Sequence, residues 1–227
     1  MKAKIFTQVA AVMLFMALLP GNAQELLTDG GFDTTAEIPL VTGDPSPDIA
    51  WYLYQSPYVT ASAYIESGIC VYNIPADGYP GDYAWEIQLI QSGFVLQQTH
   101  MYRLSYDVMA DAERDYGLFL GEAGGNWNSL IGYDKYTQYA TTEWKTVVID
   151  FKTTLIFPYH KLSFEVGAIP VSMYFDNVSL TDMGPYTPSV GILGSSLSGW
   201  DNDVDMQTAD GINYAVRFFC RIEREKT

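Results

Sequence analysis

Short runs of β-forming residues, separated by turn residues, constrain the fold of this chain more than any other feature. Residues 101–110 and 160–166 alternate apolar and polar side chains, the pattern of a strand with one buried face. Similar runs lie at residues 51–55, 63–66, 69–73, 85–90, 116–120, 145–151 and 171–180. Turn signals such as Asp77-Gly78 and Ser92-Gly93 separate them, and no convincing amphipathic helix is found. The chain is predicted to be all-β: a jelly-roll β-sandwich of two antiparallel sheets with a short C-terminal extension.

Residues 1–24 have the pattern of a signal peptide. Lys2 and Lys4 precede an apolar run at residues 5–19, and small residues follow Pro20. The run is short for a membrane-spanning helix, and no later stretch is apolar for long enough. We therefore expect an exported protein without membrane insertion, located in the periplasm, at the outer membrane or outside the cell. The sandwich is expected to occupy residues 25–183.

The C-terminal part is expected to be a separate segment. Residues 184–189 (GPYTPS) are typical of a linker, and residues 190–227 contain two strand-like runs around an acidic stretch. About 40 residues cannot bury a proper core unaided, so the segment either docks or begins a truncated second domain. Residues 201–205 (DNDVD) begin like a calcium loop, but Met206 and Ile212 replace its required glycine and glutamate. We predict a solvated acidic loop there.

The charge balance excludes one class of partner. The chain has 27 acidic and 12 basic residues and a net charge of −15. Nucleic-acid binding depends on basic residues that neutralise phosphates, so a nucleic-acid ligand is not expected, whereas a neutral ligand is compatible. Cys70 and Cys220 either pair, which an exported protein permits, or stay as separate thiols. No Cys/His spacing is typical of a zinc site.

Aromatic residues are the main candidates for ligand binding. Many lie in loops rich in Gly, Pro and Asn, and Trp127, Tyr133 and Tyr136 form one such group. The apolar faces of sugar rings stack on aromatic rings, while sugar hydroxyls pair with amides and carboxylates. The alternative for each ring is ordinary packing in the core.

Residues 85–91 (WEIQLIQ) are a second candidate region. Strand alternation would put Trp85, Ile87 and Leu89 on one face and Glu86, Gln88 and Ile90 on the other. The polar face could bind sugar hydroxyls or could simply be solvated.

The sequence gives little support for catalysis. Glycoside hydrolysis requires two carboxylates about 5–10 Å apart, and Glu86 and Glu165 could face each other across one sheet. Among 27 acidic residues, however, such a pair is expected by chance. The chain contains no nucleophile elbow, phosphate-binding loop or HExxH motif. We predict a non-enzymatic protein; a jelly-roll glycoside hydrolase and a structural or adhesion sandwich remain the alternatives.

Six segments and Trp51 together resemble the family 4/9 carbohydrate-binding modules. The segments are residues 25–33 (ELLTDGGFD), 67–71 (SGICV), 85–89 (WEIQL), 102–106 (YRLSY), 141–145 (TTEWK) and 173–180 (MYFDNVSL). The resemblance covers about residues 25–183 and depends on the order and spacing of the segments. It implies a jelly roll whose concave face binds β-glucan or xylan chains without catalysis.

The resemblance also implies site residues. The carbohydrate-binding positions are Tyr54, Trp85, Glu86, Gln88, Gln91, Trp127, Tyr133 and Glu165. Family members tend to hold a structural Ca²⁺ on the opposite face, and the positions similar to its ligands are Gly31, Gly68 and Asp176. Two features depart from the family. Some members form a disulfide between a cysteine like Cys70 and a cysteine in the last strand; here that last-strand position looks like Tyr174, so the disulfide is absent. In addition, residues 37–48 form an insertion.

The tail resembles a second family. Residues 190–194 (VGILG) and 199–206 (GWDNDVDM) are similar to the repeated module of the SusE/SusF-type outer-membrane glycan-binding proteins. This resemblance implies a polysaccharide-uptake system of a Gram-negative bacterium, with outer-membrane glycan-uptake proteins as partners. It also implies that the module is truncated.

Overall fold

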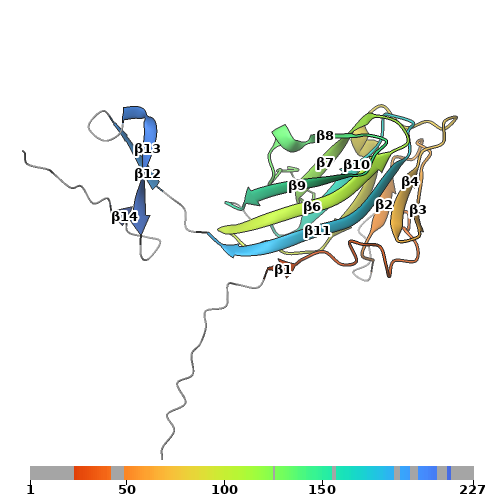
Figure 1. Cartoon of the computed structure of the whole chain (residues 1–227). Coiled ribbons are helices and arrows are strands. Elements are labelled where there is room, and N and C mark those ends of the chain that lie inside the picture. Colours follow the sequence, from red (N-terminus) through yellow and green to blue (C-terminus); the bar gives the residue numbers. More distant parts are fainter. Residues whose placement is uncertain are drawn as a thin grey trace, which may run out of the picture.

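The computed structural model describes residues 23–41, 49–124, 126–154 and 157–186, and the backbone of three further strands between residues 190 and 215. The predicted signal peptide falls outside the described residues, except for positions 23 and 24, and so does Cys220. Over the described part the fold is all-β, with two antiparallel sheets that form the layers of a sandwich (Figure 1).

The larger sheet has the strand order β3-β4-β11-β6-β9, with β1 paired to β11. Its strands are β1 (Gln24–Glu25), β3 (Ser62–Glu66), β4 (Ile69–Asn73), β6 (His100–Ala110), β9 (Lys145–Lys152) and β11 (Met173–Pro185). The alternation predicted for residues 101–110 is confirmed: Tyr102, Leu104, Tyr106 and Val108 are fully buried. Their polar neighbours face away from the core, as the two-residue period of a strand requires.

The smaller sheet has the order β2-β5-β10-β7-β8. Its strands are β2 (Tyr52–Gln55), β5 (Ile87–Ser92), β7 (Arg114–Glu122), β8 (Thr137–Ala140) and β10 (His160–Glu165). Two short 3₁₀ helices, η1 (Ala84–Glu86) and η2 (Tyr133–Lys135), lie just before β5 and β8. All six residues of the central strand β10 are buried, so side chains cover this sheet on both faces.

Aromatic rings join the two sheets. Phe164 of β10 lies 4.8 Å from the ring of Tyr106 on β6 and 4.4 Å from that of Phe175 on β11. The hydroxyls of Tyr106 and Tyr116 form a buried hydrogen bond of 2.9 Å, which satisfies both groups inside the core. Cys70 is a buried free thiol, and its neighbour across the β4–β11 pair is Phe175, whereas Tyr174 lies opposite Val71.

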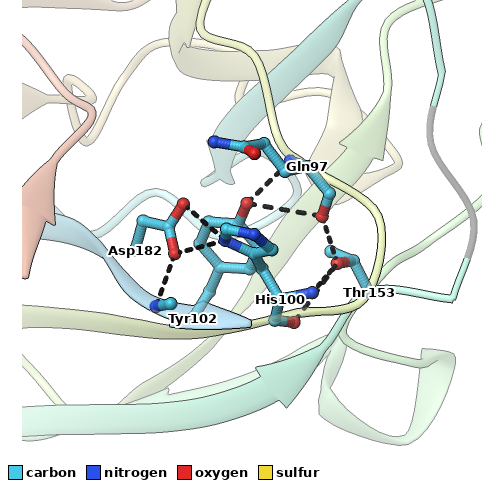
Figure 2. A network of polar contacts seen from close by, with 6 residues as sticks. Gln97, His100, Tyr102, Thr153 and Asp182 are labelled. Carbon is cyan, nitrogen blue, oxygen red and sulfur yellow. Dashed lines mark hydrogen bonds and ion pairs between the residues drawn. The ribbon is translucent and has the colours of Figure 1, made fainter. Parts of the chain in front are cut away.

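A polar network joins the ends of β6, β9 and β11 (Figure 2). His100 Nδ1 lies 2.8 and 2.9 Å from the two carboxylate oxygens of Asp182. The backbone N–H of Gln97 donates to the Tyr102 hydroxyl at 2.7 Å, and Thr153 Oγ1 donates to the Gln97 carbonyl. The network connects residues far apart in the sequence, so it fixes the ends of three strands relative to one another.

Strands β12 (Val190–Gly194), β13 (Gly199–Thr208) and β14 (Tyr214–Ala215) form a third, antiparallel sheet. The acidic residues 201–205 belong to β13, so the expectation of a loop there was wrong. The pairing of β13 with β12, in which Val204 and Asp205 lie opposite Ile192 and Gly191, accounts for the difference, because the ladder satisfies the backbone regardless of side-chain charge. No helix within the described ranges is long and apolar enough to cross a membrane.

Candidate functional site

The outer face of the smaller sheet, the side turned away from the core, brings three predicted site residues into one row. Gln88 of β5 lies opposite Tyr54 of β2 on one side and opposite Glu165 of β10 on the other. Gly117 and Thr137 continue the row onto β7 and β8. Neighbouring strands are about 4.8 Å apart, so the row spans roughly 19 Å at right angles to the strands. A polar row of this length suits an extended ligand.

Glu165 is held in a fixed orientation within this row. Its carboxylate accepts hydrogen bonds from the Tyr136 hydroxyl at 2.5 Å and from Ser163 Oγ at 3.2 Å. Burial, followed by the nearby Glu165 carboxylate, raises the pKa of Tyr136, so the phenol stays protonated and donates at neutral pH. Glu165 is buried, so it presents an ordered polar surface rather than a mobile side chain.

A lysine, which the sequence did not single out as a site residue, occupies the middle of the same face. Lys161 lies four positions before Glu165 on β10, and its Nζ donates to Gln88 Oε1 at 2.9 Å. The ammonium also lies 4.6 Å from the ring centroid of Trp127 and 5.4 Å from that of Phe119. Burial lowers the pKa of Lys161. The alternation identified Lys161 as polar, but nothing local indicated that its end group meets two rings.

The predicted loop aromatics Trp127 and Tyr133 are exposed, at 51% and 70% respectively. The Trp127 ring meets the edge of Phe119 at a centroid distance of 6.4 Å, and the Tyr133 hydroxyl donates to the Trp127 carbonyl at 3.1 Å. Trp127 is therefore anchored beside the face while half of its surface remains open to a ligand.

Trp85 is also exposed, although strand alternation had placed it with Ile87 and Leu89, which are in the core. The alternation was wrong there because residues 84–86 form η1, and β5 begins only at Ile87. The Trp85 ring stacks on Tyr83 at 5.8 Å, and its carbonyl accepts from Gln88 Nε2 at 2.6 Å. Trp85 thus reaches the polar row through its backbone.

Two predicted residues serve the scaffold. The carboxylate of Glu86 accepts hydrogen bonds from the Tyr58 hydroxyl and from the N–H groups of Asp82 and Tyr83, and these bonds lower its pKa. Gln91 lies opposite the core residue Leu162, and its amide bonds both the N–H and the carbonyl of Thr28. Glu86 therefore fixes the loop before η1, and Gln91 ties the N-terminal segment to β5.

The three predicted calcium-ligand positions gather near one another, with an additional aspartate. A Cβ at Gly68 would lie 3.6 Å from Asp33 Oδ1 and 3.8 Å from the Gly31 carbonyl oxygen. Burial raises the pKa of Asp176, and the charges of Asp107 and Asp33 raise it further. The described residues hold no cluster of three or more His, Cys, Asp or Glu side chains suited to a metal. Any ion here would therefore depend on backbone carbonyls as well as carboxylates, which are the hard oxygen ligands that Ca²⁺ accepts.

A cavity of about 400 Å³ lies beside Trp51 and the N-terminal segment. Its lining includes Thr28, Asp29, Thr35 and Glu37. None of its lining residues belongs to the polar row, so the cavity is separate from the candidate site.

An antiparallel sandwich with an ordered polar row and exposed rings at one face defines the class of carbohydrate-binding β-sandwich modules. The chain belongs to the carbohydrate-binding domain family CBM_4_9, whose model matches residues 24–170. No curated protein matches the chain.

Two solved structures support the fold. One is described as a CBM4 structure; it is 20% identical, covers 69% of this chain and 99% of its own, and has a TM-score of 0.57. The other is the second N-terminal cellulose-binding domain of β-1,4-glucanase C from Cellulomonas fimi. It is 21% identical, covers 71% of this chain and 95% of its own, and has a TM-score of 0.52. At these identities the likeness shows the β-sandwich fold alone.

Proposed function

We propose that this chain binds polysaccharide of the β-glucan or xylan type across the outer face of the smaller sheet, without cleaving it. The observation that carries the proposal is the row from Tyr54 through Gln88 to Glu165, with the half-exposed rings of Trp85 and Trp127 beside it. Membership of a carbohydrate-binding family supports it, as does the cellulose-binding domain among the similar structures.

The hydrogen bonds of the two candidate carboxylates favour binding over hydrolysis. Glu86 is committed to backbone N–H groups and to Tyr58, and Glu165 is committed to Tyr136 and Ser163. General acid catalysis by a carboxyl group needs a raised pKa, whereas the pKa of Glu86 is lowered.

Affinity electrophoresis against laminarin, xylan, mixed-linkage glucan and starch tests the proposal. We expect retardation on at least one of the β-glucan or xylan gels. Trp127→Ala and Trp85→Ala should each weaken binding about tenfold or more, as expected for a central aromatic contact. Trp144→Ala is the matched control, because Trp144 is equally exposed but precedes β9 in the other sheet. No retardation on any gel, or equal losses for all three variants, would contradict the proposal.

We also propose a structural Ca²⁺ held by the Gly31 and Gly68 carbonyls and the Asp176 carboxylate, with Asp33 as a further ligand. Supporting this are the closeness of Asp33 to Gly31 and Gly68 and the mutual repulsion of Asp33 and Asp176, which a cation would relieve. The ion would neutralise the acidic cluster and hold the N-terminal segment against β11.

The setting of the function is proposed from the sequence. We infer export from the signal-peptide pattern at residues 1–24. The SusE/SusF-like pattern after residue 190 suggests that the protein acts in a bacterial system for glycan uptake or degradation. Fractionation of expressing cells tests this, since recovery of the protein in the cytoplasm with residues 1–24 retained would contradict export.

A further inference from the structure

The two buried cations of the described chain use their hydrogen-bond donors very differently. The Arg114 guanidinium donates to the carbonyls of Asp115, Val166, Gly167, Ile169 and Val171. Lys161 Nζ has a single hydrogen-bond acceptor among the described residues, Gln88 Oε1. An ammonium group has three donors, so two of them have no acceptor on the described residues.

Lys161 also forms no close ion pair in the part of the chain that is described, and the Glu165 carboxylate attracts it only from beyond 4.0 Å. The exposed cations Arg103 and Lys135 each pair with an aspartate, at 2.7 and 2.8 Å, but no carboxylate lies within 4.0 Å of Lys161 Nζ. The carboxylate of Glu165, on the same strand, is already engaged by Tyr136 and Ser163. A buried charge is unfavourable unless it is paired, and contacts with the rings of Trp127 and Phe119 compensate only in part.

The Lys161 ammonium lies beside the polar row on which the saccharide is proposed to bind. Its Nζ is 4.6 Å from the centroid of Trp127, a ring that is half exposed at the edge of the polar row. A saccharide lying along the polar row would pass over Gln88, whose amide oxygen accepts from Lys161 Nζ, and its substituents would then come close to the ammonium. A hydroxyl there could accept a hydrogen bond, but only an anionic group would also balance the charge.

We propose that Lys161 recognises a carboxylate on the bound glycan, so that the site prefers a polysaccharide with uronic acid groups to its neutral counterpart. The inference depends on the proposed glycan-binding function and narrows its ligand class. The net charge of −15 opposes an acidic ligand at a distance, but salt screens this repulsion beyond about 8 Å at physiological ionic strength. Local contacts then decide the preference.

Calorimetric titration with matched ligands tests the inference. The probes are a linear xylo-oligosaccharide and the same oligosaccharide with one glucuronic acid side group, both at 0.15 M salt. We expect wild-type protein to bind the acidic probe about tenfold more tightly, as for a hydrogen-bonded charge at a partly covered site. Lys161→Met, which keeps much of the packing volume, should abolish that preference, so that its affinities for the two probes differ by less than about twofold. Lys135→Met, a change at an exposed lysine of η2, should preserve the preference.

Each outcome separates this inference from the proposed function. If wild-type protein bound both probes equally tightly, the proposal that Lys161 recognises a carboxylate would be overturned, while the proposed glycan binding would stand. If Lys161→Met lost the same factor of affinity for both probes, Lys161 would only support the Trp127 ring, and this would also overturn the carboxylate proposal. Failure of wild-type protein to bind any glycan would overturn both. The wild-type comparison needs no variant, so it decides the question even if Lys161→Met fails to fold.

Discussion

Gly117 makes room for the contact that orients Glu165. A Cβ at this position would lie 2.7 Å from both Cζ and the hydroxyl oxygen of Tyr136, and 3.0 Å from the Cβ of Glu165. The two contacts of 2.7 Å are closer than real Cβ atoms come, so a side chain at position 117 would push the Tyr136 ring away from the strand. The Tyr136 hydroxyl then reaches Glu165 from above the sheet. One missing side chain thus sets the position of a carboxylate in the polar row.

Tyr136→Phe tests this contact. The variant keeps the ring but removes the donor to a buried carboxylate, so we expect the free energy of unfolding to fall by about 1–2 kcal/mol and glycan affinity to drop. Urea unfolding and the glycan titration measure the two effects. Tyr139→Phe is the control, because the Tyr139 hydroxyl donates to an exposed carboxylate, Glu113, and its loss should cost little. If both variants unfold at the same urea concentration, Tyr136 does not orient Glu165 as we infer.

At the scale of single elements, β11 is the strand on which most of the larger sheet depends. It pairs with β1, β4 and β6, and its C-terminal half carries Asp182, which meets His100 at the start of β6. The same carboxylate accepts from the N–H of Gly184 at 2.7 Å. Asp182 is buried, so its hydrogen bonds are shielded from water and contribute more than an exposed pair does.

Asp182→Ala should therefore be costly. It leaves the His100 ring and a backbone N–H without their partner, and we expect a loss of about 2–3 kcal/mol in urea unfolding. The matched change is Asp150→Ala, which removes the partner of Arg103 in an exposed pair of the same sheet and should cost less than about 1 kcal/mol. A smaller loss for Asp182→Ala than for Asp150→Ala would show that the network in Figure 2 does not hold the strand ends.

The elements also show what the sequence could and could not predict. The burial pattern of β6 was predictable, because alternation is a local property of the chain. The start of β5 was not, because the hydrogen bonds from residues 82 and 83 to the Glu86 carboxylate create η1 and turn Trp85 outward. The family resemblance named the three residues of the polar row, but their alignment could not be predicted, for a different reason. Tyr54, Gln88 and Glu165 align only through the registers of two strand pairs, which tertiary packing sets. Lys161 was missed because its contacts, Gln88 of β5, Phe119 of β7 and Trp127, are far from it in the sequence.

At the scale of the whole molecule, some of the excess acidic side chains lie close enough together in the folded protein to repel one another and lower its stability. Burial and the charges of Asp107 and Asp33 raise the pKa of Asp176 above its ordinary value of 3.8. A carboxyl group with a raised pKa in the folded state binds its proton more tightly there than in the unfolded chain. Its contribution to stability is therefore largest below about pH 3.8, and is lost as the pH rises through the folded-state value. A bound cation would reverse this loss at neutral pH.

Asp176→Asn separates the two effects. Without calcium, the variant should be more stable than wild-type protein at pH 7, because a neutral amide replaces the repelled carboxylate, and the difference should shrink toward pH 4. With calcium at about one hundred times its dissociation constant, wild-type protein should gain about 2.7 kcal/mol and the variant much less. Thermal unfolding at both pH values, in chelator and in calcium, measures all four states. Asp150→Asn is the control, because Asp150 is salt-bridged to Arg103 and lies away from the cluster. If calcium raised the thermal unfolding midpoint equally for wild type and Asp176→Asn, Asp176 would not be a ligand of the ion. If the variant were already less stable than wild type in chelator at pH 7, the Asp176 carboxylate would be paired rather than repelled.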